Sequence, residues 1–257
     1  MGENFGVALL LTAIAGCSTG LGSLLGISIR PGPRFMGASL GFAAGIMILI
    51  SFVELLANAV ASVGFLAAHL AFFGGMLFMY LVDILVPHMY MAEHGRHDAP
   101  GPAAPHQGRV HRAGTLLALG IGIHNFPEGM ATFAGALQDV HLGLAMAVAI
   151  AVHNVPEGLA VAAPIYAATG NRRRAFFYSL LSGIAEPIGA LVGGLILLPF
   201  LSQAVLAYVL AAVGGLMVFI SLDELVPASR EYGFEHSTIL ATMLGMAVMA
   251  VSLWLLL

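Results

Sequence analysis

Long, nearly uncharged apolar stretches constrain the fold of this chain more than any other feature. A helix needs ~20–25 apolar residues to cross the hydrocarbon core of a bilayer, and this sequence supplies that length repeatedly. Across the 257 residues, 60% are hydrophobic and 9% are charged, whereas soluble domains carry about 25% charged residues. The stretches are continuously apolar and do not alternate, so we expect helices and not a β-barrel. We therefore predict an all-α integral membrane protein.

Breaks in hydropathy divide the chain into eight predicted transmembrane helices within one membrane domain, residues 1–257. None of the connections is long enough to hold a separate soluble domain. The amino terminus, MGENFGVALL, lacks a basic segment, so we expect a first span there and not a cleaved signal peptide. The predicted spans cover residues 5–27, 36–60, 65–91, 113–136, 142–167, 175–198, 203–228 and 237–257.

The placement of the arginines predicts the orientation of these spans. All nine basic residues are arginine, and every one falls in an odd-numbered connection between predicted spans. Connections rich in basic residues face the cytoplasm. We therefore expect the odd-numbered connections inside and both termini outside. The arginines are Arg30, Arg34, Arg96, Arg109, Arg112, Arg172, Arg173, Arg174 and Arg230.

The longest connection, at about 92–112, is rich in Pro, Gly and Ala, and we predict a flexible cytoplasmic loop. Its histidines are suited to weak, exchangeable contact with metal ions. A solvated linker with incidental histidines explains the same composition. The histidines are His94, His97, His106 and His111.

Two of the predicted spans resemble each other. When the chain is shifted by 170 residues, GIMILISFVEL (45–55) matches GLMVFISLDEL (215–225) at six positions. The predicted orientations of these two spans are opposite, which is typical of an inverted-topology repeat. Spans 1–3 would then correspond to spans 6–8, with spans 4 and 5 between them. Such repeats are typical of secondary transporters, whose substrate site lies near the membrane midplane.

The pattern His-Asn-x-Pro-Glu-Gly occurs twice, at 124–129 and 153–158, near the middle of predicted spans 4 and 5. Ionisable side chains are costly at that depth, so they indicate function by default. Within each copy, His and Glu lie four residues apart and share one face of a helix. Predicted span 6 adds a glutamate within SGIAEPIGA. The candidate metal ligands are His124, Asn125, Glu128, His153, Asn154, Glu157 and Glu186.

Each of these three spans also carries a proline beside its acid. A proline inside a helix has no N–H to donate, so the carbonyl four residues earlier loses its partner. At mid-membrane, such a carbonyl is tolerated only where protein or a water-filled cavity satisfies it. We therefore predict a polar cavity. The prolines are Pro127, Pro156 and Pro187, and the carbonyls are those of Ile123, Val152 and Gly183.

Imidazole and carboxylate ligands together favour Zn²⁺, with Fe²⁺, Mn²⁺, Co²⁺ and Cd²⁺ as competitors. Three carboxylates carry a formal charge of −3, which suits either one or two divalent ions, and carboxylates can bridge two ions ~3.5–4 Å apart. Cys17 is the single cysteine, so a thiolate site is excluded.

The roles of four further residues stay open. Met47 on span 2 is either a packing residue or a soft metal contact. Three acids near the ends of spans 2 and 7 are either structural or draw cations into the entrance and exit. They are Glu54, Asp223 and Glu224.

The motifs HNFPEG, HNVPEG and AEPIGA, in this order, resemble those of the ZIP family of divalent-metal transporters, and the resemblance covers essentially the whole chain. It implies a binuclear metal centre in which the seven candidate residues are the ligands. It also implies uptake into the cytoplasm by alternating access across the cell (inner or plasma) membrane, and a homodimer. We expect divalent metal ions and the bilayer as partners, and no nucleic acid.

Two other classes of function remain as alternatives. An intramembrane metal-dependent hydrolase would need an open coordination position and a base, and His-x₃-Glu lacks the second histidine of HExxH. A metal sensor would usually carry a soluble signalling domain, and the connections leave no room for one. We therefore expect a transporter and not an enzyme, with Zn²⁺ as the transported ion.

Overall fold

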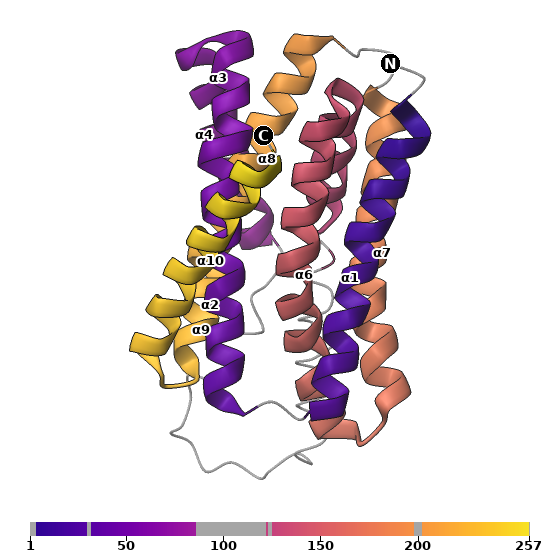
Figure 1. The fold of residues 1–257 in the computed structure, drawn as a ribbon, viewed down its shortest axis with the longest axis vertical. Helices are drawn as coiled ribbons and strands as arrows, with labels where there is room; N and C mark the ends of the chain where they lie inside the picture. Colours follow the sequence, from indigo (N-terminus) through magenta and orange to yellow (C-terminus); the bar gives the residue numbers. More distant parts are fainter. Residues whose placement is uncertain (1–3, 30–31, 86–121, 123–124, 198–201, 257) are drawn as a thin grey trace.

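The chain is almost entirely helical in the part that its computed structural model describes, which is residues 4–29, 32–85, 122, 125–197 and 202–256 (Figure 1). Within these residues, seven helices are long and apolar enough to cross a membrane, judged by length and composition. The fourth predicted span lies partly outside them, although residues 125–138 are helical. The predicted loop at 92–112, with its four histidines, lies entirely outside them.

Five of the predicted spans are single α-helices, and their described ends lie within a few residues of the predicted ones, except that the predicted end of the third span at residue 91 lies outside the described residues. Local caps set several ends. The Asp139 side chain accepts a hydrogen bond from the Leu142 N–H at 3.0 Å and begins one helix, which ends at Gly170 with a φ of 64°. The helices are α1 (Phe5–Ile29), α4 (Phe65–Leu85), α6 (Val140–Thr169), α7 (Arg172–Leu197) and α10 (Glu235–Leu256).

The second and seventh predicted spans each contain a π-helical segment. Span 2 consists of α2 (Pro33–Ile50), η2 (Ser51–Leu56) and α3 (Ala57–Val63). Span 7 consists of α8 (Gln203–Ile220), η4 (Ser221–Leu225) and α9 (Val226–Glu231).

The two π-segments begin at equivalent residues, because Ser51 and Ser221 are related by the same shift of 170 residues as the two matching sequences. The Ser51 hydroxyl donates to the Met47 carbonyl at 2.6 Å, and the Ser221 hydroxyl donates to the Met217 carbonyl at 2.7 Å. The two halves of the chain thus share a local distortion as well as a sequence pattern. Isolated π-turns within α-helices are frequent at functional sites.

Two helices from the first part of the chain each pack against a helix from the last part. These pairs are α2 with α10 and α4 with α8. A Cβ atom on Gly45 would collide with the Thr242 carbonyl of α10, and a Cβ atom on Gly215 would collide with the Phe72 carbonyl of α4. Both the glycines and the carbonyls are related by the shift of 170 residues. Equivalent backbone contacts therefore join the first part of the chain to the last in both pairs.

Helix α6 lies between the two sides of the molecule (Figure 1). It packs against α1 and α7 on one side and against α2 and α10 on the other. Helices α1 and α7 also pack on each other, where Gly16 and Gly183 meet so closely that a Cβ atom on either would collide with the carbonyl oxygen of the other. The helix that carries the second motif is thus packed on two sides by the rest of the fold.

Candidate metal centre

The second motif lies within α6, which continues through Pro156 without a break. Its three candidate ligands, His153, Asn154 and Glu157, are fully buried. The opposite face of α6 turns its apolar side chains outward, and Val152 is 37% exposed. Burial therefore separates the polar face of this helix from its apolar face.

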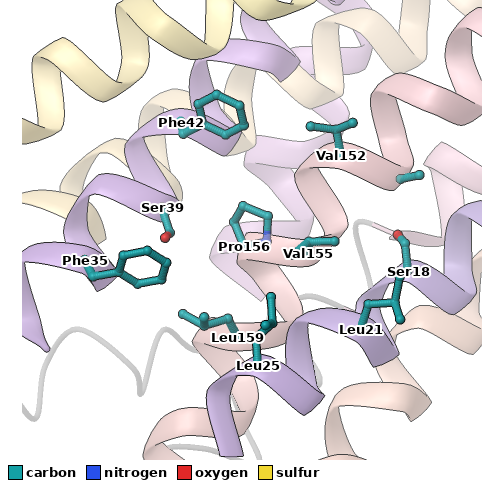
Figure 2. Close-up of a pocket in the computed structure, with 11 residues that line it drawn as sticks. Ser18, Leu21, Leu25, Phe35, Ser39, Phe42, Val152, Val155, Pro156 and Leu159 are labelled. Atoms are coloured by element: carbon teal, nitrogen blue, oxygen red, sulfur yellow. The ribbon is translucent and has the colours of Figure 1, made fainter. Parts of the chain in front are cut away.

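The apolar face of α6 forms one wall of a groove of about 440 Å³ between α1, α2 and α6. Figure 2 shows Val155 and Pro156 on this wall, with Phe35 and Phe42 of α2 across the groove. None of the six candidate metal ligands that the structure describes lines it. The groove is therefore not the metal centre.

Of the first motif, residues 125–129 are described, and they lie within the helical residues 125–138. Asn125 and Glu128 are fully buried, as is Glu186 on α7. His124 lies outside the described residues. Six of the seven predicted ligands are thus placed, and all six are inaccessible to solvent.

Three of these side chains come together through His153. Its Nε2 atom lies 3.3 Å from Oε2 of Glu128 and 3.7 Å from Oε1 of Glu157. Two ligand atoms bound about 2.1 Å from one tetrahedral zinc ion lie about 3.4 Å apart. The separations between these atoms are therefore close to those within a zinc coordination shell.

Two further predicted ligands meet through an amide. The Nδ2 atom of Asn154 donates a short hydrogen bond to Oε1 of Glu186 on α7. The same nitrogen donates to the Ala15 carbonyl on α1 at 2.9 Å. One asparagine on α6 therefore holds the carboxylate of α7 and the backbone of α1 in place.

The first motif has an equivalent link. Nδ2 of Asn125 donates to the Ser182 carbonyl on α7 at 3.2 Å. The amide nitrogen of each asparagine thus donates to a backbone carbonyl of a neighbouring helix. The amide oxygen of each asparagine therefore points away from that carbonyl.

Four oxygen atoms of the predicted ligands have no hydrogen-bond partner within the described residues. They are Oδ1 of Asn125, Oε1 of Glu128, Oδ1 of Asn154 and Oε2 of Glu186. A buried polar atom without a partner costs about 1–3 kcal/mol, and more if charged. All four can act only as electron-pair donors when the carboxyls are ionised, which is what a hard or borderline cation requires. The donor set therefore fits a divalent cation.

In the described part of the chain, no three His, Cys, Asp or Glu side chains are arranged to hold a metal ion as they stand. His153 contacts Glu128 and Glu157 separately, and the three side chains do not form a ready-made coordination site. Side-chain rotation would be needed to turn their donor atoms toward one ion.

The four residues whose roles the sequence left open lie in different surroundings. Met47 is fully buried in the main hydrophobic cluster, a position that suits packing, and its predicted alternative role as a soft metal contact stays a prediction. Glu54, in η2, accepts a hydrogen bond from Asn58 Nδ2 at 3.0 Å. Asp223 and Glu224 are half-buried within η4.

The sequence did not identify α1 as part of the site, yet α1 supplies the Ala15 carbonyl to Asn154. The available signal was its run of small residues, GCSTGLGS at 16–23, because small residues let membrane helices approach closely. Gly22 has this role, since a Cβ atom there would collide with the Val155 carbonyl of α6.

Comparison with known proteins gives consistent results over the whole chain. The family described as ZIP Zinc transporter matches residues 91–253. A protein of Chlorobium luteolum named "Zinc transporter ZupT" is 51% identical over 264 residues, covering 99% of both chains. Proteins of the same name are 45% identical in Streptococcus mutans, over 99% of both chains, and 47% identical in Nitratidesulfovibrio vulgaris, over 98% of both.

Proposed function

Because this chain belongs to the ZIP family of zinc transporters, we propose that it carries Zn²⁺ into the cytoplasm through the buried cluster around His153. The protein is a multi-pass membrane protein that transports zinc, and it is not an enzyme. The observation that carries the proposed site is the 3.3 Å approach of His153 Nε2 to Glu128 Oε2. This contact joins the two copies of the motif at one point inside the protein.

The proposed site has enough donor atoms to bind two ions. One ion is held by the imidazole of His153 and, by analogy of the motifs, of His124. The second is held by the amide oxygens of Asn125 and Asn154 and by Glu186. Glu128 and Glu157 bridge the two ions, as carboxylates do in other two-metal sites. The unpartnered oxygens of Asn125, Asn154 and Glu186 support this division.

The direction of transport is proposed to be inward, through eight spans with both termini outside. The paired π-segments, and the equivalent contacts of Gly45 and Gly215, support an inverted repeat of spans 1–3 and 6–8. Alternating access by movement of one helix group against the other is the transport mechanism that such repeats favour. A homodimer, and a role for the loop histidines in accepting the ion, stay predictions.

The proposed site also admits Fe²⁺, Mn²⁺, Co²⁺ and Cd²⁺, because its nitrogen and oxygen donors suit all of them. The alternative of a metal-dependent hydrolase is wrong, since the chain belongs to a family of zinc transporters. The proposed site contains no cysteine, which also suits transport. An ion held by nitrogen and oxygen donors is released more readily than one held by thiolates.

The site is tested by replacing Glu128 and Glu157, one at a time, with glutamine, which keeps the shape and removes the charge. Zinc uptake into proteoliposomes should be lost in both variants. Zinc binding to the purified protein should weaken by more than the roughly 10–100-fold that loss of a supporting residue causes. Glu235→Gln is the matched control, because Glu235 is an exposed acid at the start of α10, and it should transport normally.

The number of ions is tested in the same preparations by counting zinc bound per chain at saturation. We expect two in the wild type and one in Glu186→Gln, which alters one side of the site only. Undiminished uptake in both Glu128→Gln and Glu157→Gln would overturn the proposed site. A single bound ion in the wild type would overturn the binuclear arrangement alone.

A further inference from the structure

Thr19 on α1 is a fully buried threonine whose hydroxyl oxygen has no hydrogen-bond partner among the described residues. A buried threonine in a helix usually donates to the carbonyl four residues earlier, as Thr12 does to Ala8 at 2.8 Å. For Thr19 that carbonyl belongs to Ala15, which already accepts from the Ser18 hydroxyl at 2.6 Å and from Asn154 at 2.9 Å. The side chain is thus a buried polar group that no ordinary packing role satisfies.

The Thr19 hydroxyl lies where α1 meets both acid-bearing helices. A Cβ atom on Gly183 of α7 would lie 2.8 Å from this oxygen, and Gly183 is three residues before Glu186. On α6, Gly158 directly follows Glu157 and packs against the Thr19 carbonyl. Thr19 is therefore adjacent to the helical turns that carry Glu157 and Glu186.

Helices α1 and α7 present equivalent groups to the two copies of the motif. Asn154 donates to the Ala15 carbonyl and Asn125 donates to the Ser182 carbonyl. Ala15 and Ser182 are 167 residues apart, as are Gly16 and Gly183, which contact each other. One shift therefore relates the faces that α1 and α7 turn toward the site.

The motif glycines follow the same relation. Gly158 packs against the Thr19 carbonyl and Gly129 packs against the Glu186 carbonyl. Thr19 and Glu186 are also 167 residues apart. Thr19 thus occupies on α1 the position that Glu186 occupies on α7.

We propose that the hydroxyl of Thr19 is an eighth donor to the transported ion, bound directly or through one water molecule, on the side of the site opposite Glu186. This inference rests on the proposed site. The α7 side of the site has the negatively charged carboxylate of Glu186, whereas the α1 side has the neutral hydroxyl of Thr19. The two sides of the site therefore differ by one negative charge. The ion is therefore held less tightly on the α1 side, which favours its release.

The first test is Thr19→Val, which keeps the shape of the side chain and removes the hydroxyl. Binding of the second zinc ion should weaken roughly threefold to tenfold, the worth of one hydrogen-bond-strength contact. The KM for uptake should rise by the same factor, and Thr19→Ser should restore both values. Thr12→Val is the matched control, since Thr12 is equally buried on α1 but bonds to Ala8, and its zinc affinity should not change.

The second test is Thr19→Asp, which supplies the missing carboxylate. Zinc should bind more tightly, by about tenfold or more if the new carboxylate reaches the ion, and the maximal rate of uptake should fall because release slows. This gain of affinity cannot come from a damaged fold, so the proposal stays testable even if Thr19→Val folds poorly.

Unchanged zinc affinity in both Thr19→Val and Thr19→Asp, alongside loss of the second ion in Glu186→Gln, would overturn the role of Thr19 and leave the proposed site intact. If Glu128→Gln and Glu157→Gln also transport normally, the proposed function itself fails. The two failures are therefore distinguishable.

Discussion

Asn154 joins three helices through one amide nitrogen, which donates to the Ala15 carbonyl on α1 and to Glu186 on α7. Its counterpart Asn125 makes the corresponding link to Ser182 on α7. At the scale of the residue, the two asparagines are therefore positioning groups as well as proposed ligands. The amide geometry that anchors the nitrogen also fixes where the oxygen points.

Replacing Asn154 by leucine should destabilise the protein, because it removes the donor to the buried Glu186 carboxylate and the hydrogen bond between α6 and α1. The Ala15 carbonyl keeps the Ser18 hydroxyl as a donor, so the expected loss is about 1–3 kcal/mol for the one buried group left unsatisfied. It is measured as a lower midpoint of thermal unfolding in detergent without zinc.

Asn58→Leu is the comparison, since among the described residues Asn58 donates only to Glu54 of its own helical turn. Glu54 is less completely buried than Glu186, so the loss there should be smaller, and an equal effect would contradict the interhelical role.

The candidate ligands were predictable from the sequence, because His, Asn and Glu are costly within apolar spans. Their partners on α1 and α7 were not. Ala15 and Ser182 contribute backbone carbonyls, which any residue supplies, so no side-chain pattern marks them. Thr19 could be recognised only after the contacts of α1 with α7 placed it opposite Glu186.

At the scale of the element, helix positions followed from hydropathy, and capping residues explain why the observed ends differ slightly. The π-segments at Ser51–Leu56 and Ser221–Leu225 were not predictable. A π-turn widens the helix by one residue without requiring a particular composition, so apolar periodicity does not distinguish it from an α-turn. The sequence match between the two spans indicated that they are structurally equivalent, but it did not indicate that both contain a π-helical segment.

Helix α4 offers a direct test of close packing through two neighbouring glycines. A Cβ atom on Gly75 would collide with the Ala212 carbonyl of α8, whereas a Cβ atom on Gly74 would meet nothing within 4 Å. Gly75→Ala should therefore destabilise the protein by about 1–3 kcal/mol, as overpacking does. Gly74→Ala should be neutral or stabilise it by roughly 0.5–1 kcal/mol, because alanine favours the helix.

Thermal unfolding of the two variants in detergent provides the comparison. The same substitution at adjacent positions removes most differences in helix propensity. If Gly75→Ala were as stable as Gly74→Ala, the close approach of α4 and α8 would be wrong.

At the scale of the whole molecule, the arginine distribution predicts which connections face the cytoplasm, and single cysteines can test it. With Cys17 replaced by alanine, cysteine is introduced at the exposed residues Arg173 or Ser202. A membrane-impermeant maleimide applied to intact cells should label Ser202→Cys and leave Arg173→Cys unlabelled until the membrane is opened. Labelling of Arg173→Cys from outside would reverse the proposed orientation, and labelling of both from the same side would refute the assigned span count.

The pairing of α2 with α10 and of α4 with α8 has a consequence for biosynthesis. Domains generally fold from the amino terminus as the chain is made, but here Gly45 of α2 packs against Thr242 of α10, which is synthesised much later. The surface of α2 around Gly45 therefore lacks its partner until α10 has been synthesised and inserted. A nascent chain that stops before α10 exposes this unfilled surface, which gives membrane quality control a physical feature by which to recognise it.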